Sequence, residues 1–88
     1  MLKEEIGFIH GVPENPDKTW KKEINGKTFT FVKKRVGKNG IFLYNCARYS
    51  EVGRFVSASS TGFHSDRNLT PDEVERLPQF ANFIAERS

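Results

Sequence analysis

The side chains with the greatest catalytic potential in this sequence are two histidines and one cysteine, His10, His64 and Cys46. A pair of histidines can act as general acid and general base in RNA cleavage, because the imidazole pKa lies near neutral pH. Here the two histidines stand far apart, and neither belongs to a recognisable catalytic motif. The sequence also lacks a glycine-rich phosphate loop, a nucleophile elbow and a metalloprotease helix. We therefore expect a protein that is not an enzyme.

A second candidate for chemistry is a metal site built from Cys46, His64 and Asp66. Zinc is usually held by four ligands of these types in a tetrahedral arrangement. This set supplies three ligands, and Glu51 is the one further candidate. The alternative is that Cys46 is a small buried residue in a central strand, because unpaired cysteines are among the most buried residue types. We favour this alternative, and we expect neither a metal nor any other cofactor.

The clearest pattern in the sequence is a block of positive charge. The chain has 88 residues and a net charge of +3, but residues 18–54 contain ten Lys and Arg against two Glu. Such a block attracts polyanions and neutralises nucleic-acid phosphates. We expect nucleic acid, either DNA or RNA, to bind the basic residues Lys21, Lys22, Lys33, Lys34, Arg35, Lys38, Arg48 and Arg54. Alternatively, the lysines solvate the open face and protect the edges of a small sheet.

Two further expectations concern what the basic block binds. Trp20, Tyr44 and Tyr49 would stack on bases if they are not part of the core. A protein-binding module is the alternative, such as an inhibitor or adaptor encoded by a phage or a mobile element. Its basic surface would dock on an acidic host protein.

A small antiparallel sheet is expected to position these residues. Asn25-Gly26 predicts a two-residue hairpin turn between strands at 18–24 and 27–34, because both turn positions require positive φ. In the second strand, phenylalanines alternate with threonines, which is typical of a strand with one buried face. Asn39-Gly40 predicts another turn after this strand.

The second half of the sheet is expected to follow in chain order. Residues 41–48 are apolar on both faces, so they predict a central strand. A turn at 49–53, a short strand at 54–58 and a polar loop at 59–69 follow. The result is a meander, because strands that are adjacent in sequence usually pair.

The C-terminal segment carries the signals of a helix. Thr70 is expected to be the N-cap, Pro71 the first helical residue, and Glu73 the partner that closes a capping box. Pro78 predicts a kink or a division into two short helices. An apolar stripe is expected to cover one face of the sheet through Val74, Leu77, Phe80, Ala81, Phe83 and Ile84. The predicted fold class is α+β: a three- to four-stranded antiparallel meander packed against a capped, Pro-kinked C-terminal helix.

Length and composition predict one small domain over residues 1–88. Residues 1–17 are expected to form a short strand plus a loop, or to be partly flexible. The single cysteine excludes an intramolecular disulfide. Since no apolar run is long enough for a membrane helix and the chain starts without a signal peptide, we expect a cytoplasmic protein without a membrane partner.

The segment from Asn25 to His64 resembles the zinc-dependent DNA-binding sheets of the FLYWCH and WRKY types. The shared features are Asn25-Gly26, Phe29-x-Phe31-Val32-Lys33-Lys34-Arg35, Asn39-Gly40, Tyr44-Asn45-Cys46, Arg48-Tyr49 and the late His64. The second cysteine of those families is missing here, where Val52-Gly53 stands, and their His-x-His pair is reduced to His64-Ser65-Asp66. The resemblance implies a DNA-binding sheet that has lost its metal and gained a C-terminal helix.

Overall fold

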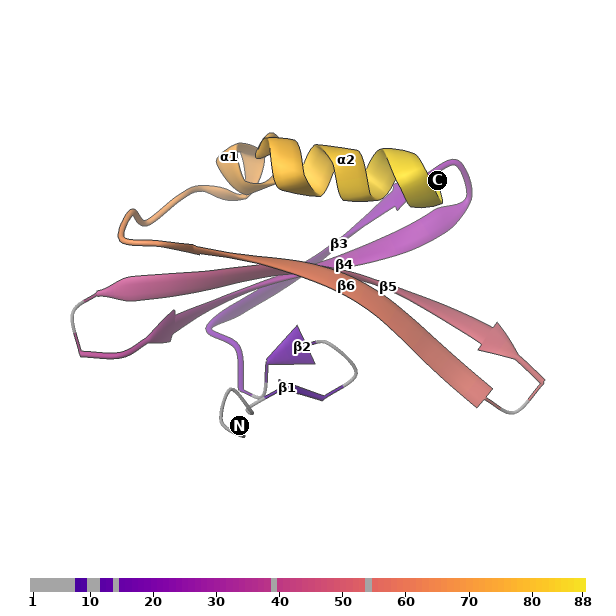
Figure 1. Ribbon diagram of the computed structural model, residues 1–88, viewed down its shortest axis with the longest axis horizontal. Helices are drawn as coiled ribbons and strands as arrows, with labels where there is room; N and C mark the ends of the chain where they lie inside the picture. Colours follow the sequence, from indigo (N-terminus) through magenta and orange to yellow (C-terminus); the bar gives the residue numbers. More distant parts are fainter. Residues whose placement is uncertain (1–7, 10–11, 14, 39, 54) are drawn as a thin grey trace.

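A computed structural model describes residues 8–9, 12–13, 15–38, 40–53 and 55–88 of the chain. A four-stranded antiparallel sheet forms its centre, with two helices on one face and a pair of very short strands on the other (Figure 1). The elements are β1 (Phe8–Ile9), β2 (Val12–Pro13), β3 (Lys18–Ile24), β4 (Lys27–Val36), β5 (Ile41–Val52), β6 (Phe55–Ser65), α1 (Pro71–Glu75) and α2 (Pro78–Arg87). The predicted α+β class and the meander order of the sheet, β3-β4-β5-β6, are confirmed.

The first hairpin forms as its turn residues predict. Asn25 has φ of 54° and Gly26 has φ of 77°, and Ile24 pairs with Lys27 on either side of the turn. This two-residue turn fixes the register of the two strands, because each residue back from the turn in β3 faces the matching residue forward in β4. In the second turn, Gly40 has φ of 75°, while Asn39 lies outside the described residues.

The last two strands are longer than the sequence suggests. The predicted turn at 49–53 and the predicted loop at 59–69 are wrong, because β5 continues to Val52 and β6 extends from Phe55 to Ser65. Their pairing is continuous from Val52 opposite Phe55 to Phe42 opposite Ser65. The segment that forms β6 is rich in hydroxyl groups and lacks the apolar alternation typical of a strand. It is a strand because β5 pairs with its backbone along the whole length.

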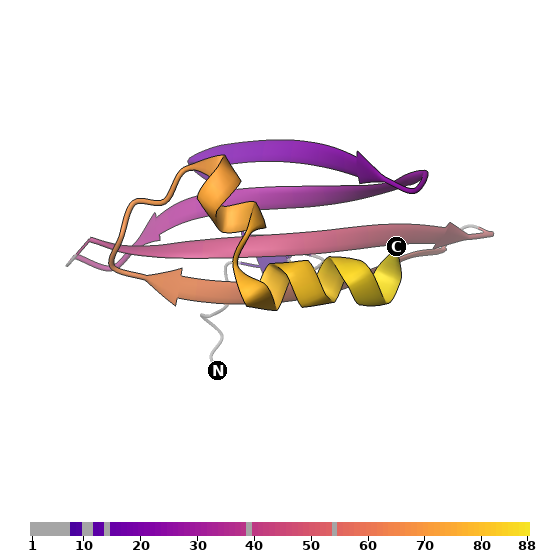
Figure 2. The same ribbon diagram turned by 90° about the horizontal axis from the view of Figure 1, so that it is seen from above.

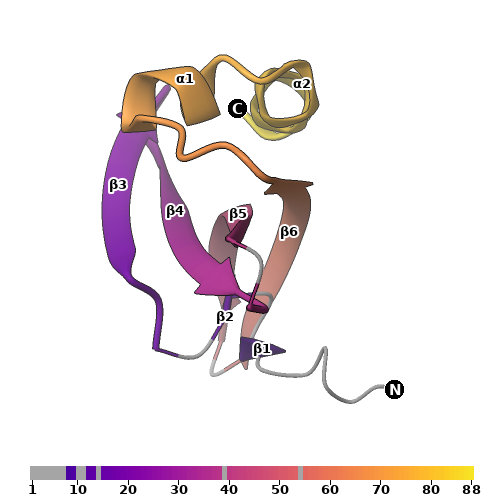
Figure 3. The ribbon, with the colours of Figure 1, turned by 90° about the vertical axis from the view of Figure 1, so that its left-hand side faces the viewer.

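The hydrophobic core lies between the sheet and the helices (Figure 3). Phe29 and Phe31 of β4 meet Phe83 and Phe80 of α2 edge-to-face, with ring centroids 6.3 Å and 6.2 Å apart. Trp20 stacks on Phe31 from β3 at 5.4 Å. Aromatic pairs at these distances add to the free energy gained from burying the rings. The rings therefore fix α2 against the sheet.

The capping box predicted at Thr70 is present. The hydroxyl of Thr70 accepts from the backbone N–H of Glu73, and the Glu73 carboxylate accepts from the backbone N–H of Thr70 at 2.8 Å. Pro78 then separates α1 from α2, which is the two-helix form of the expected interruption. Among the described residues, neither helix is long and apolar enough to cross a membrane.

The apolar stripe of the helices is confirmed except at one residue. Val74, Phe80 and Phe83 are buried, and Leu77 and Ile84 pack against the core. Ala81 is exposed, so its assignment to the stripe is wrong. A new helix starts at Pro78, and its inward positions are Phe80 and the residues three and four positions later, Phe83 and Ile84. Ala81 does not belong to this series and lies off the buried face.

The opposite face of the sheet is also buried in its middle. Its buried residues are Thr30, Val32, Leu43, Asn45 and Ala47. Strands β1 and β2 pair antiparallel on this side, and β2 lies against β4 and β5. Because β5 has buried residues on both faces, its predicted central position is confirmed.

Candidate nucleic-acid interface

Strand register gathers basic residues at one end of the sheet, on the face that carries the helices. Lys18 of β3 pairs with Lys33 of β4, and Arg35 of β4 pairs with Phe42 of β5. Directly paired residues of antiparallel strands project from the same face. We call this group, together with two residues from neighbouring segments, the basic end: Lys18, Lys33, Arg35, Lys38, Arg67 and the ring of Phe42.

The ring of Phe42 contacts two cations of the basic end. The Nζ atom of Lys33 is 5.3 Å from the ring centroid, and the Cζ atom of Arg35 is 6.0 Å from it. Cations at such distances are attracted to the electron-rich face of an aromatic ring. The ring in turn stacks on Tyr44 at 6.3 Å. Two positive groups are thus held together although they repel each other.

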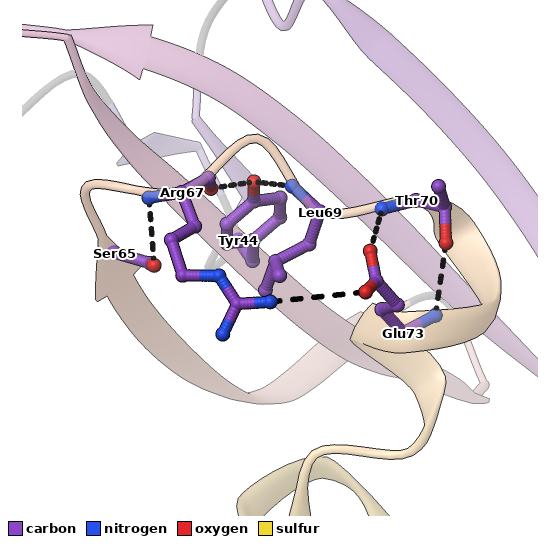
Figure 4. A network of polar contacts seen from close by, with 6 residues as sticks. All are labelled: Tyr44, Ser65, Arg67, Leu69, Thr70 and Glu73. Carbon is purple, nitrogen blue, oxygen red and sulfur yellow. Dashed lines mark hydrogen bonds and ion pairs between the residues drawn. The ribbon is translucent and has the colours of Figure 1, made fainter.

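A hydrogen-bonded loop holds Arg67 beside Tyr44, the stacking partner of Phe42 (Figure 4). The hydroxyl of the fully buried Tyr44 donates to the carbonyl of Arg67 at 2.7 Å and accepts from the backbone N–H of Leu69 at 2.8 Å. The N–H of Arg67 donates to the Ser65 hydroxyl at 3.0 Å. These contacts fix the backbone of the loop and leave 72% of the Arg67 side chain exposed.

Acidic groups neutralise this end only in part. The Glu73 carboxylate is 3.8 Å from the guanidinium of Arg67, and both side chains are open to solvent, so this ion pair is weak. The Asp17 carboxylate accepts from the backbone N–H of Arg35 at 2.6 Å, which fixes the start of β3 to β4. Lys33 donates to the amide oxygen of Asn68, a neutral partner. The basic end therefore keeps an excess of positive charge.

The structure brings together some of the basic residues predicted to bind and separates others. Lys33, Arg35 and Lys38 lie at the basic end. Lys34 is at the same end but on the opposite face, because side chains alternate along a strand. Lys21 is exposed on that opposite face as well, near the middle of β3.

Three further predicted residues lie away from this group. The Nζ atom of Lys22 is 2.7 Å from the Glu75 carboxylate, which also accepts from the indole N–H of Trp20 at 3.0 Å. Arg48 is half-buried under the helices, and its Nε has no hydrogen-bond partner among the described residues. Arg54 lies outside the described residues. The predicted set is therefore not one continuous surface.

Two of the five cationic residues of the basic end were missing from the sequence prediction, as was the ring of Phe42. Lys18 could have been found, since a two-residue turn at Asn25-Gly26 necessarily places it opposite Lys33. Arg67 could not, because its position depends on the contact of a loop with the distant Tyr44 hydroxyl. No local sequence signal reports such a contact.

The candidate zinc ligands do not converge. Cys46 is fully buried on the helix-covered face, opposite Phe31, and burial raises the pKa of its thiol to about 12. His64 is exposed and pairs with Leu43, so its side chain projects from the other face. Within the described part of the chain, no three His, Cys, Asp or Glu residues are grouped as metal ligands would be. Cys46 has the surroundings of a small core residue.

The remaining candidates for chemistry and stacking are also dispersed. His10, the second histidine of the possible acid–base pair, lies outside the described residues. Tyr44 belongs to the core and offers no free ring for stacking on a base. Trp20 is half-buried against Phe31. Tyr49 is half-buried on the opposite face, and burial raises its pKa.

Comparisons with protein families, with curated proteins and with solved structures gave no match for this chain.

Proposed function

We propose that this chain is a small, non-catalytic binding module of the cytoplasm that contacts the phosphate backbone of nucleic acid through its basic end. The observation that carries the proposal is the group of five cationic residues at one end of the sheet, drawn from β3, β4, the β4–β5 turn and the loop before α1, two of which lie against the ring of Phe42. The resemblance to DNA-binding sheets of the FLYWCH and WRKY types stays a prediction within this proposal.

The contact would be electrostatic and largely independent of base sequence. Lys18, Arg35 and Lys38 are exposed, so their charged groups can approach phosphates without rearrangement of the fold. Each phosphate neutralised in this way releases condensed counterions, which is the main source of non-specific affinity. Phosphate contacts position a protein on nucleic acid without reading its sequence. The ring of Phe42 is engaged by Lys33 and Arg35, so it is not expected to stack on bases.

The test is a titration of labelled duplex DNA, single-stranded DNA and RNA at about 50 and 200 mM salt, the range in which phosphate contacts are most evident. The test variant neutralises three exposed residues of the basic end, Lys18→Gln, Arg35→Gln and Lys38→Gln. The matched control removes the same charge elsewhere, through Lys21→Gln, Lys27→Gln and Arg76→Gln. Within the described part of the chain, none of these six side chains forms a hydrogen bond to a core residue, and the bond of Arg35 to Asp17 uses the backbone N–H, which the substitution keeps.

We expect the wild type and the control to bind at low salt, with affinity that falls steeply as salt rises. We expect the basic-end variant to bind at least about tenfold more weakly and to lose about 0.9 from the logarithmic salt slope for each phosphate contact removed on duplex DNA. Equal losses in both variants would mean that net charge alone matters. Absence of binding to all three nucleic acids at the lower salt would refute the proposal.

A second candidate function is docking on an acidic protein surface. It is favoured by the confinement of the basic end to one end of the sheet, where Lys33 and Arg35 share the ring of Phe42, instead of a stripe along the full length of the strands. A basic patch of this kind can steer and orient an acidic partner. The same variants titrated with poly-glutamate distinguish the two. Binding of poly-glutamate that depends on the basic end, without binding of nucleic acid, would select the protein partner.

A further inference from the structure

The helix-covered face of the sheet carries a second cationic group, at the end of α2 away from the basic end. Arg87 is the last residue of α2, and its Nε donates to the Ser59 hydroxyl of β6 at 3.0 Å. Arg48 of β5 is the strand partner of Ser59, so both side chains project from this face. The sheet extends past the end of α2 (Figure 2), and Ser59 is exposed. Two arginines therefore flank one accessible hydroxyl group.

Arg48 is the member of this group that lacks a partner. Its Nε is buried and has no hydrogen-bond partner among the described residues. Its strand partner on β4, Phe29, packs edge-to-face on Phe83, and the guanidinium of Arg87 lies over the Phe83 ring at 4.2 Å. A charged donor that is removed from water without a partner costs free energy. A bound ion is one explanation of such a donor in a folded protein.

We propose that Arg48, Arg87 and Ser59 form a binding site for a phosphate group, carried by a small molecule or by the end of a nucleic-acid strand. The site is independent of the basic end, because none of its residues belongs to that group.

The three side chains supply donors and no unused acceptor of negative charge. The guanidinium of Arg48 presents a planar fork of N–H donors. The Ser59 oxygen already accepts from Arg87, which leaves the Ser59 proton available to a ligand oxygen. Guanidinium groups bind phosphate through parallel hydrogen bonds. A phosphate group also offers more acceptor oxygens and more negative charge than a carboxylate, so it matches this set of donors better.

The acidic residues near this end do not neutralise Arg48. The Glu75 carboxylate accepts from Lys22 at 2.7 Å and from the indole N–H of Trp20. The Glu86 carboxylate is 3.2 Å from Nη1 of Arg87, and its side chain is 72% exposed, so this pair is weak. Within the described ranges, no carboxylate forms an ion pair with Arg48. A phosphate group would therefore meet a positive charge that the chain leaves uncompensated.

The first experiment observes the arginine side chains of the wild-type protein by NMR during a titration with inorganic phosphate. Chloride keeps the ionic strength constant, because general screening acts on all exposed charges. The Nε–H signals of Arg48 and Arg87 should shift and saturate, whereas that of the exposed Arg76 on the other helix should move little. An Arg48 signal without a saturable shift, or equal shifts of Arg48 and Arg76, would overturn the proposal.

The second experiment measures thermal unfolding with and without inorganic phosphate. Phosphate at about ten times its dissociation constant should raise the Tm of the wild type by roughly 5–10 °C, because it binds only the folded state. Arg48→Met keeps an apolar stem of similar length and should bind phosphate at least about tenfold more weakly. Arg76→Gln is the matched control and should respond as the wild type does, and circular dichroism establishes that both variants are folded.

The basic-end variant separates this site from the proposed nucleic-acid interface. It should keep the full response to phosphate, because its substitutions lie at the other end of α2. An Arg48→Met variant that keeps the response, or a basic-end variant that loses it, would place phosphate elsewhere and overturn the proposal.

The third experiment distinguishes the two sources of the phosphate group. Labelled single-stranded DNA with a phosphate at its end is compared with the same strand ending in a hydroxyl group. Tighter binding of the phosphorylated strand that Arg48→Met abolishes would assign the site to a strand end. A response to inorganic phosphate without a difference between the strands would assign it to a small phosphate compound. A wild type that responds to neither probe would refute the site.

Discussion

The two faces of the sheet are buried by different means. On the helix-covered face, the rings of Phe29 and Phe31 meet those of Phe83 and Phe80, and the contacts are specific in geometry. On the opposite face, the buried side chains are smaller and include the polar Thr30 and Asn45. The Asn45 side-chain oxygen has no hydrogen-bond partner among the described residues.

This difference indicates where the free energy of folding is concentrated. An aromatic side chain buries on the order of 150–250 Å², and edge-to-face packing adds about 0.5–1.5 kcal/mol for each pair. Val32 and Ala47 on the opposite face bury much less surface each, and a buried polar atom without a partner costs free energy. The helix-covered face should therefore dominate stability, and the opposite face should tolerate substitution better.

The most direct test compares one truncation on each face. Phe31→Ala should lower the free energy of unfolding by about 3–5 kcal/mol, because it removes a ring that contacts both Trp20 and Phe80. Leu43→Ala on the opposite face should cost less, near the lower end of the usual range of about 2–5 kcal/mol. Urea unfolding measures both values. A Leu43→Ala variant less stable than Phe31→Ala would contradict the comparison.

The second test uses the buried thiol of the helix-covered face as a reporter. Burial raises the pKa of Cys46 from 9.0 to about 12, so the folded state keeps the thiol neutral while the unfolded chain ionises above pH 9. The stability that this group contributes is complete below pH 9 and is lost as pH rises toward 12. The loss should be about 1.4 kcal/mol for each pH unit within this window.

Cys46→Ala provides the reference for that measurement, because every other titrating group is common to both proteins. The free energy of unfolding of the wild type should fall more steeply than that of Cys46→Ala between pH 9 and pH 10.5. Parallel pH profiles would mean that the thiol is accessible to water in the folded state. The helix layer would then cover this face less tightly than its aromatic contacts indicate.

The elements predicted correctly from the sequence are those that local chemistry determines. Asn25-Gly26 specifies its hairpin because both residues adopt positive φ. Thr70 and Glu73 specify the helix start because their side chains bind each other's backbone N–H groups. Such signals act between residues a few positions apart, and tertiary contacts do not need to be known.

The elements that escaped prediction depend on distant partners. Strand β6 is hydroxyl-rich and becomes a strand because β5 pairs with it along its length. Arg67 reaches the basic end because its carbonyl binds the hydroxyl of Tyr44. The alternation of side chains likewise divides Lys33 from Lys34, so a run of basic residues in the sequence is not a patch on the surface.

The third test addresses the loop between β6 and α1, which connects the sheet to the helix layer. Tyr44→Phe keeps the ring in the core but removes the hydroxyl that binds the Arg67 carbonyl and the Leu69 N–H. The Leu69 N–H is buried, so leaving it unpaired should cost about 1–3 kcal/mol. Hydrogen exchange at Leu69 should accelerate, and unfolding in urea gives the free energy. Tyr49→Phe on the opposite face is the control and should change stability by less than about 0.5 kcal/mol. Equal losses of stability in the two variants would mean that the Tyr44 hydroxyl does not stabilise the loop.

The smallest expected effect concerns how the helix layer begins. Thr70→Ala removes the hydroxyl that accepts from the Glu73 N–H and should cost about 1 kcal/mol, whereas Thr70→Ser should cost little.

The capping contact with the Thr70 backbone lowers the pKa of Glu73 below its usual value of 4.5, so the stability from this carboxylate is present at neutral pH and lost as pH falls through the lowered value. Because the Thr70 backbone N–H remains in Thr70→Ala, that variant should keep the acid sensitivity, and Glu73→Gln should reduce it. Thermal unfolding between neutral and acidic pH distinguishes the contribution of the Thr70 hydroxyl from that of the Glu73 carboxylate. Loss of the acid sensitivity in Thr70→Ala alone would mean that the hydroxyl, and not the backbone, holds the carboxylate in its ionised form.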